Sequence, residues 1–109
     1  FDYESHFACY PTGAFYKKHL DAFRGNGKRG QSNRVLSTVL YLNDAWQPSD
    51  GGELLLYSED DDNKVIETIL PECGRLVIFL SEKFPHEVLP AKRERKSIAG
   101  WFRVNESAI

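Results

Sequence analysis

A histidine and an aspartate lie two positions apart, at His19 and Asp21, directly after a strand-like stretch. Side chains at positions i and i+2 of a strand point to the same face, so these two can converge if the strand continues through both. An imidazole with a carboxylate suits a divalent first-row metal, although two ligands do not complete a site. The pair alone is a weak signal, and two unrelated polar residues at a strand end are the alternative.

A third ligand must come from one of the other two histidines in the chain. His6 lies in an apolar stretch, for which we predict a buried, hydrogen-bonded imidazole. His86 follows the apolar run RLVIFL and a short loop, and the proline before it restricts the approach of the chain. Two histidines and one carboxylate, with the other positions open, form the facial triad of non-heme iron(II) oxygenases. His19, Asp21 and His86 are therefore the candidate catalytic metal ligands.

Arg95 opens the last long strand-like stretch, nine residues after His86. A metal-bound 2-oxo acid with a distal carboxylate needs a fixed cation. A guanidinium binds carboxylate through two parallel hydrogen bonds and stays charged when desolvated. Strand alternation places Trp101 on the same face as Arg95, as a wall of the same pocket. Lys96 is the competing anchor, but it points the opposite way and ranks lower.

Short apolar stretches separated by turn-forming sequences predict an all-β core. We expect strands over residues 6–10, 15–20, 34–42, 53–58, 64–70, 75–80, 86–89 and 95–104. The stretches between them, such as QPSDGG and SEDDDN, are rich in the residues that turns require. This spacing favours a jelly roll, in which two Greek-key sheets form an open-mouthed barrel. Only LDAFR is expected to form a brief helical turn.

Composition is that of one globular domain, with 109 residues of which 41% are hydrophobic. A formal net charge of −2 gives no support for a nucleic-acid partner, and the apolar runs are too short for a membrane span. Cys9 and Cys73 are far apart, which favours reduced, packed thiols in a cytoplasmic protein over a disulfide. Because the chain starts at Phe1 and contains no methionine, we expect a fragment that lacks flanking helices.

The chain resembles the iron(II)- and 2-oxoglutarate-dependent dioxygenases, and among them the prolyl 4-hydroxylase family. The resemblance spans nearly the whole chain and rests on the order of HFACYPTGAFYKKHLD, RVLSTVLYLNDAW, GGELLLY, GRLVIFLS, FPHEVLPAKRER and IAGWF. It is strongest to bacterial enzymes similar to the animal oxygen-sensing prolyl hydroxylases, which use arginine where collagen-type enzymes use lysine. It implies a double-stranded β-helix (jelly roll) and a single catalytic domain over residues 1–109.

The resemblance assigns roles to the residues that carry it most strongly. His19, Asp21 and His86 would bind iron(II), and Arg95 would hold the distal carboxylate of 2-oxoglutarate. Tyr41, from VLYLN, would donate a second hydrogen bond to that carboxylate.

Four further residues would surround the cosubstrate. Tyr10 would reach it from another strand, Leu54 and Trp101 would line the pocket, and Tyr16 would lie near the mouth. Each of these is also an ordinary strand residue, so its assignment depends on the order of the whole set. The basic stretch AFRGNGKRGQSN after Asp21 is longer than the family pattern, and either a substrate-contacting loop or a solvated loop is expected there.

The reaction implied by the resemblance is hydroxylation of a protein-bound proline. Molecular oxygen and 2-oxoglutarate would be consumed, succinate and carbon dioxide released, and ascorbate would serve as an optional reductant. The translation machinery is a target class by analogy alone. Two alternatives stay open: an oxygenase acting on a free amino acid, a small metabolite or an alkylated base, and a cupin-like domain that binds metal or ligand without turnover.

Overall fold

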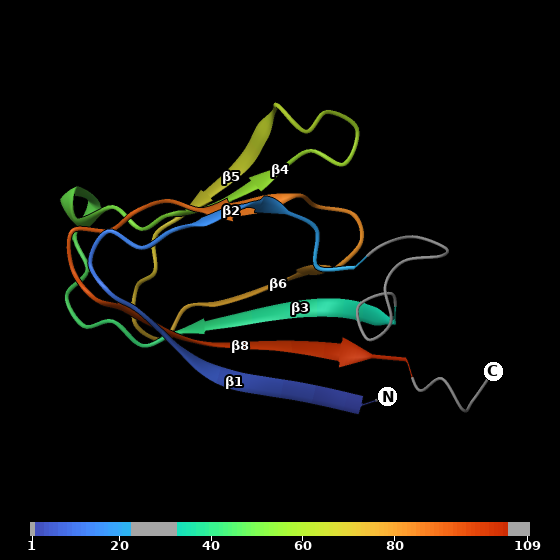
Figure 1. The fold of residues 1–109 in the computed structure, drawn as a ribbon, viewed down its shortest axis with the longest axis horizontal. Coiled ribbons are helices and arrows are strands. Elements are labelled where there is room, and N and C mark those ends of the chain that lie inside the picture. Colours follow the sequence, from blue (N-terminus) through green and yellow to red (C-terminus); the bar gives the residue numbers. More distant parts are fainter. Residues whose placement is uncertain (1, 23–32, 105–109) are drawn as a thin grey trace.

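Eight antiparallel strands form two four-stranded sheets that lie face to face in the computed structural model (Figure 1). The structure describes residues 2–22 and 33–104. The strands are β1 (Asp2–Tyr10), β2 (Tyr16–His19), β3 (Arg34–Tyr41), β4 (Leu54–Tyr57), β5 (Val65–Ile69), β6 (Leu76–Leu80), β7 (His86–Val88) and β8 (Arg95–Arg103). Each predicted strand is present within a few residues of its expected bounds. A short 3-10 helix, η1 (Pro48–Asp50), lies in the QPSDGG turn, where only a turn was predicted.

The chain passes repeatedly from one sheet to the other. One sheet has the order β1-β8-β3-β6 and the other β2-β7-β4-β5, so strands adjacent in sequence are seldom adjacent in a sheet. This winding is that of a double-stranded β-helix, and the predicted jelly roll is confirmed. Among the described residues, no helix is long and apolar enough to cross a bilayer.

The core lies between the sheets, where alternate side chains of each strand meet. Its buried centre is formed by Leu54 and Leu56 of β4, Phe79 of β6 and Val88 of β7. The outer face of the first sheet is less well covered, because Leu76 and Ile78 alternate with the inward residues of β6 and are exposed. The core therefore holds the two sheets together at the base of the space between them.

Strand β1 differs from its prediction because it lies at the edge of its sheet. His6 was predicted to be buried, which is wrong: its side chain is exposed, and so is Phe7, at 60%. Cys9 and Cys73 are both free, as predicted for reduced thiols, but both are exposed rather than packed. A periodic apolar pattern does not reveal whether a strand has a neighbour on both sides.

Two predicted features of the loops have different outcomes. SEDDDN forms the predicted turn, which joins β4 and β5 as a hairpin, and its side chains are mostly exposed. The first residues of LDAFR form a bend rather than a helical turn, and its last two residues lie outside the described ranges. Most of the basic stretch between Asp21 and β3 is likewise outside them, so the two expectations for it stay predictions.

Candidate active site

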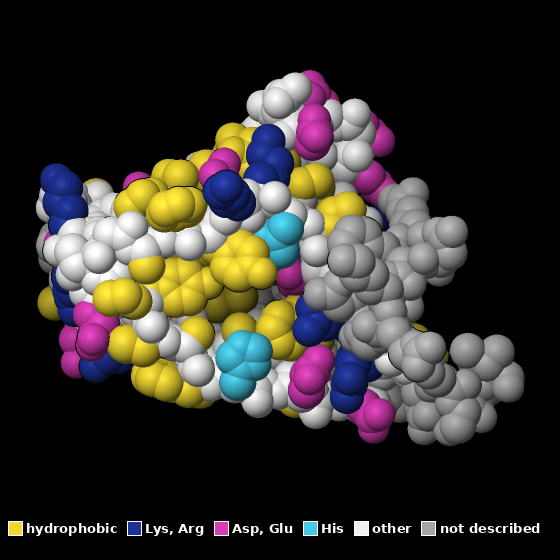
Figure 2. Space-filling model, in the orientation of Figure 1, with side chains coloured by type: hydrophobic (Ala, Val, Ile, Leu, Met, Phe, Trp, Pro, Cys, Tyr) yellow, Lys and Arg dark blue, Asp and Glu magenta, His cyan; other side chains and the backbone are white. Residues whose placement is uncertain are grey.

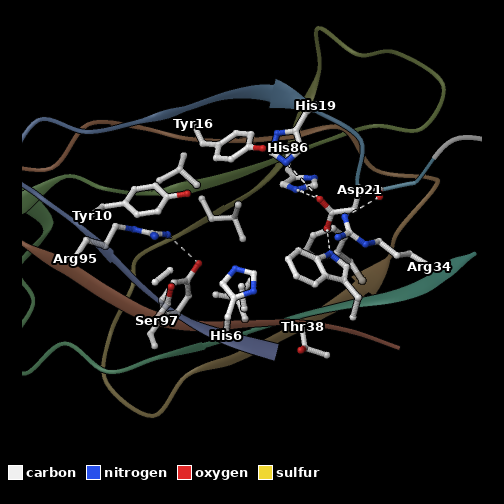
Figure 3. A pocket seen from close by; sticks show the side chains of 18 of the residues that line it. His6, Tyr10, Tyr16, His19, Asp21, Arg34, Thr38, His86, Arg95 and Ser97 are labelled. Atoms are coloured by element: carbon white, nitrogen blue, oxygen red, sulfur yellow. Dashed lines mark hydrogen bonds and ion pairs between the residues drawn. The ribbon is translucent and has the colours of Figure 1, made fainter. Parts of the chain in front are cut away.

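A pocket of about 350 Å³ opens between the two sheets. Figure 2 shows it as a hollow with histidine side chains on opposite sides of its mouth. In Figure 3 its two ends differ in chemistry: His19, His86 and Asp21 gather at one end, and Arg95 lies at the other. The pocket therefore has a metal-ligand end and a cationic end.

The predicted triad comes together because of strand register. His19 ends β2 and His86 begins β7, and the two are direct partners across these strands. Asp21 lies in the bend after β2, with its Oδ1 3.3 Å from His19 Nε2 and 3.1 Å from His86 Nε2. The three candidate ligand atoms all lie within 4.8 Å of one another. Two nitrogens and one carboxylate oxygen thus converge on one point.

Backbone carbonyls determine which ring nitrogen of each histidine faces that point. His19 Nδ1 lies 2.7 Å from the carbonyl oxygen of Lys17, and His86 Nδ1 lies 3.0 Å from that of Phe84. Since a carbonyl oxygen only accepts, each Nδ1 must carry a hydrogen, and each neutral ring offers the lone pair of Nε2. Two such lone pairs beside an ionised carboxylate repel one another unless a cation lies between them. The donor set therefore fits a divalent metal ion.

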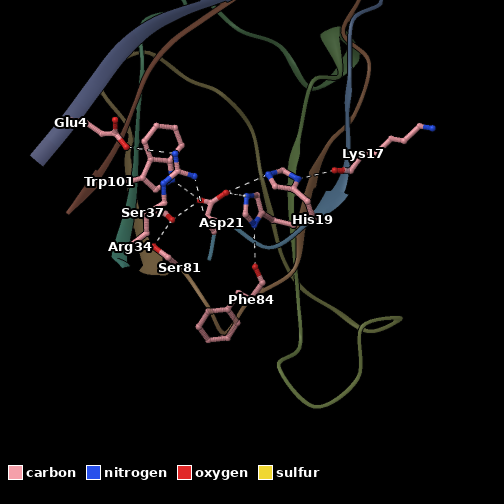
Figure 4. A network of polar contacts seen from close by, with 10 residues as sticks. Glu4, Lys17, His19, Asp21, Arg34, Ser37, Ser81, Phe84 and Trp101 are labelled. Atoms are coloured by element: carbon pink, nitrogen blue, oxygen red, sulfur yellow. Dashed lines mark hydrogen bonds and ion pairs between the residues drawn. The ribbon is translucent and has the colours of Figure 1, made fainter. Parts of the chain in front are cut away.

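The second oxygen of Asp21 is held by the neighbouring strands (Figure 4). Ser37 Oγ donates to Oδ2 at 2.5 Å, and Trp101 Nε1 donates to the same atom at 2.9 Å. Burial alone would raise the pKa of Asp21, but the adjacent His19 and His86 side chains and the hydrogen bond from Ser37 hold this pKa well below its usual range. The carboxylate is therefore ionised, with Oδ1 left for a metal.

At the other end, Arg95 is only 4% exposed and has no carboxylate partner among the described residues. Its Nε donates to the Gly52 carbonyl oxygen at 2.9 Å, and its Nη2 donates to the Tyr41 hydroxyl at 3.3 Å. Its guanidinium also lies over the rings of Tyr10 and Tyr41. A buried cation without a counter-ion is costly, so this end of the pocket suits an anionic group of a ligand.

The two tyrosines beside Arg95 keep their hydroxyl hydrogens. Burial raises the pKa of Tyr41 and of Tyr10, and the charge of Arg95 offsets only part of this. Since Tyr41 accepts from Arg95, its own O–H remains able to donate to a carboxylate in the pocket.

The GG pair before β4 explains how the backbone reaches Arg95. Gly52 has φ +70°, and a Cβ there would lie 3.0 Å from both Ala91 and Trp46 and 3.3 Å from the Arg95 side chain. Only glycine therefore fits a turn that places this carbonyl oxygen against the guanidinium. The GG pair is therefore needed to build the cationic end of the pocket.

The remaining predicted residues also lie where they can line the pocket. Leu54 is buried at its wall, and Trp101 lies beside Asp21. Tyr16 is at the mouth, half exposed, with its ring 4.1 Å from that of His19. Lys96 points to the opposite face of β8 and pairs with Glu94.

Sequence reasoning missed three residues that line or support the pocket. Ser37 holds Asp21, Arg34 stacks on Trp101 with its guanidinium carbon 3.9 Å from the ring centre, and His6 lines the mouth. Ser37 lies four residues before Tyr41 on β3, so strand alternation from Tyr41 places it on the inward face. That signal was present in the sequence.

Known proteins resemble this chain over nearly its whole length. A crystal structure of a Pseudomonas putida prolyl-4-hydroxylase is 51% identical with a TM-score of 0.83, covering 95% of this chain and 54% of that one. A Trichoplax adhaerens prolyl hydroxylase, solved with a hypoxia-inducible factor peptide fragment, is 34% identical with a TM-score of 0.80, covering 94% and 44%. A hypoxia-inducible factor prolyl hydroxylase of Caenorhabditis elegans is 38% identical over 98 residues, or 87% of this chain.

These matches cover most of this chain but a smaller share of each relative. This chain spans about half of the Pseudomonas putida structure and 12% of the Caenorhabditis elegans protein. The sequence profile of the 2OG-Fe(II) oxygenase superfamily, by contrast, matches residues 5–103, which include both ends of the pocket. The chain belongs to the 2OG-Fe(II) oxygenase superfamily.

Proposed function

We propose that this chain catalyses the iron(II)- and 2-oxoglutarate-dependent 4-hydroxylation of a proline in a protein substrate. The observation that carries the proposal is the two-ended pocket, with a His-Asp-His triad at one end and, at the other, a buried arginine that has no carboxylate partner among the described residues. Iron(II) and 2-oxoglutarate are the cofactors of the superfamily. Their chemical groups match the two ends, since one is a divalent cation and the other a dicarboxylate.

In this proposal His19, Asp21 and His86 hold iron(II) through the two Nε2 atoms and Oδ1. When bound, iron(II) and 2-oxoglutarate supply the oxidising chemistry, in which the cosubstrate is converted to succinate and carbon dioxide. Arg95 binds the distal carboxylate, and Tyr41 donates to it through its retained hydroxyl hydrogen.

Other side chains position these groups and exclude water. Ser37 and Trp101 keep Asp21 turned so that one oxygen faces the metal. Tyr10 and Leu54 close the cosubstrate end against solvent, which strengthens the interaction of Arg95 with a carboxylate. Tyr16 lies at the open mouth, where a polypeptide would approach.

Two findings support a prolyl substrate in particular. The Pseudomonas putida prolyl-4-hydroxylase shares about half of its matched residues with this chain, and the Trichoplax adhaerens enzyme was solved with a peptide. The proposed site of action is the cytoplasm, where the two free, exposed cysteines would stay reduced.

The test is a screen for proline oxidation in a cell lysate, with the translation machinery as the first target class to inspect. We expect one added oxygen on a proline with full-length protein, iron(II) and 2-oxoglutarate, and none with Asp21→Ala. Amino-acid analysis of the product then identifies the hydroxylated carbon. A lysate without any Asp21-dependent proline oxidation contradicts the proposal, and oxidation of a free amino acid instead would favour the metabolite alternative.

Succinate release separates this reaction from ligand binding without turnover. Arg95→Ala should raise the 2-oxoglutarate concentration needed for half-maximal succinate release by about tenfold or more, since a bidentate charged contact is lost. Lys96→Gln, on the opposite face of the same strand, is the matched control and should leave this concentration unchanged. Equal effects of the two changes would remove Arg95 from the site.

A further inference from the structure

Two arginines of neighbouring strands lie side by side, and one of them, Arg34, lines the pocket at its metal-ligand end. Arg34 and Arg103 are direct partners across β3 and β8, on the inward face that carries Trp101. Arg34 lines the pocket and is held by stacking on Trp101, while its Nη1 makes a long contact of 3.3 Å with the Asp21 carbonyl oxygen. Arg34 thus borders the pocket, and its register partner Arg103 lies next to it on β8.

Within the described residues, one carboxylate pairs with both of these cations. Oε1 of Glu4, on β1, lies 3.5 Å from Arg34 Nη2 and 3.8 Å from Arg103 Nη1. Both distances exceed those of charge-assisted hydrogen bonds. Asp2 faces Arg103 in the strand register but makes no ion pair with it. In the part of the chain that the structure describes, the ion pairs of these two arginines are thus two long contacts with one carboxylate.

The hydrogen-bonding capacity of the pair is also largely unused. Arg34 Nε and Arg103 Nε are buried and have no acceptor among the described residues. The side chains of Arg34 and Arg103 are 16% and 29% exposed, whereas that of Glu4 is 40% exposed. A buried guanidinium donor without an acceptor raises the free energy of the folded protein. Two adjacent arginines with such free donors are well suited to bind a carboxylate. Glu4 is the most exposed of the three side chains, whereas Arg34 is held by its stacking on Trp101.

We propose that Arg34 and Arg103 recognise a carboxylate of the protein substrate, from an Asp or Glu close in sequence to the target proline. Glu4 occupies this site in the free protein and is displaced when substrate binds. The inference rests on the proposed function, because it assumes that a polypeptide lies across the mouth. It adds a requirement for the sequence around the proline.

The test measures binding before any turnover takes place. Fluorescent peptides with a central proline carry a single Asp that is moved through the flanking positions, and each is paired with the Asn peptide. Anisotropy is recorded without oxygen, using full-length protein with iron(II) and 2-oxoglutarate. We expect one Asp position at which the peptide binds about tenfold more tightly than its Asn partner, and this preference should shrink at high salt.

Variants of opposite effect make the result specific to these residues. Arg103→Gln should abolish the preference for Asp, whereas Glu4→Gln should tighten binding of the Asp peptide and leave the Asn peptide unchanged. Lys96→Gln, exposed on the other face of β8, should change neither. Equal binding of Asp and Asn peptides at every position, or a preference that survives Arg103→Gln, overturns the inference.

Admission of oxygen distinguishes this failure from failure of the proposed function. Peptides that bind with the Asp preference but gain no oxygen on proline would contradict the proposed reaction and leave the carboxylate site standing. Peptides that are hydroxylated without any Asp preference would contradict the carboxylate site and leave the proposed reaction standing.

Discussion

Asp21 divides its two carboxylate oxygens between two tasks. Oδ1 faces the two histidine Nε2 atoms, while Oδ2 accepts hydrogen bonds from Ser37 and Trp101. A carboxylate that is free to rotate can present either oxygen, or both, to a metal. The two donors remove that freedom, so the geometry of the triad depends on residues that make no contact with the metal point.

Trp101→Phe should therefore weaken metal binding although no ligand is altered. The change removes the indole N–H but keeps an aromatic ring, and loss of such a supporting hydrogen bond lowers metal affinity by about tenfold or more. Titration of the metal-free protein with cobalt(II), followed by its visible absorption, measures this affinity. Ser37→Ala should act in the same direction. An unchanged affinity in both variants would mean that Asp21 is oriented by other contacts.

Tyr41 makes stability depend on pH in the alkaline range. Its pKa is raised in the folded state, chiefly by burial, so above the ordinary value of about 10 the unfolded chain loses a proton that the folded chain keeps. The free energy of unfolding should then fall as pH rises from about 10 toward the folded-state pKa. Tyr41→Phe should show a shallower decline in urea titrations across this range, and an identical decline would contradict the assignment.

The turn between η1 and β4 shows how one element positions a side chain of another. Gly52 lies where its carbonyl oxygen meets Arg95 Nε, and its positive φ leaves no room for a Cβ. The anchor of the cationic end is therefore built from two segments that are far apart in sequence. Neither segment alone holds the guanidinium in place.

Gly52→Ala should lower both stability and 2-oxoglutarate binding. A Cβ would meet Ala91 and Trp46 at 3.0 Å in addition to the strain of a positive φ, so a loss of about 1–3 kcal/mol is expected. Gly74→Ala is the matched control, because Gly74 has φ +82° with no atom within 4 Å of the added Cβ. Urea unfolding should show a smaller loss for the control. Equal losses would indicate that backbone strain alone matters at Gly52.

Strand alternation explains how much of the site was predictable at this scale. On β8 it placed Arg95 and Trp101 on one face and Lys96 on the other, as the structure has them. It failed for His6, because the apolar pattern of β1 does not reveal that this side chain faces the open mouth of the pocket from an edge strand. The hydrogen bond from Trp101 to Asp21 spans 80 positions and depends on how the sheets pack, which no local pattern records.

In the molecule as a whole, the two histidine ligands and the residues of the cationic end come from different sheets. His19 and His86 belong to β2 and β7 of one sheet, whereas Tyr41 and Arg95 belong to β3 and β8 of the other. The separation of the metal point from the cationic end therefore depends on the packing of the sheets and on β8, which carries both Arg95 and Trp101, the donor to Asp21. Core residues then influence ligand choice without touching a charged group.

Leu54→Ala should reduce the preference of the pocket for 2-oxoglutarate over its homologue with one more methylene. Leu54 is buried in the core and lines the pocket, so its truncation leaves a cavity, with an expected stability loss of about 2–5 kcal/mol. Leu55→Ala, one residue along and on the other face of β4, should leave the choice unchanged. The effect is measured as the inhibition, by the longer oxo acid, of succinate release from 2-oxoglutarate. Unaltered discrimination would show that the core does not set ligand length.

The sandwich fixes the distance between the two ends of the pocket, and this distance sets the length of a dicarboxylate that can reach both. His19 and His86 lie on one sheet and Arg95 on the other, while Trp101, on the same strand as Arg95, holds Asp21 at the metal-ligand end. Because protein interiors are close-packed, this framework deforms little, and a dicarboxylate of the wrong length can contact only one end of the pocket at a time. Selectivity for chain length would then be inherited with the fold itself, while the residues around the mouth remain free to change the substrate.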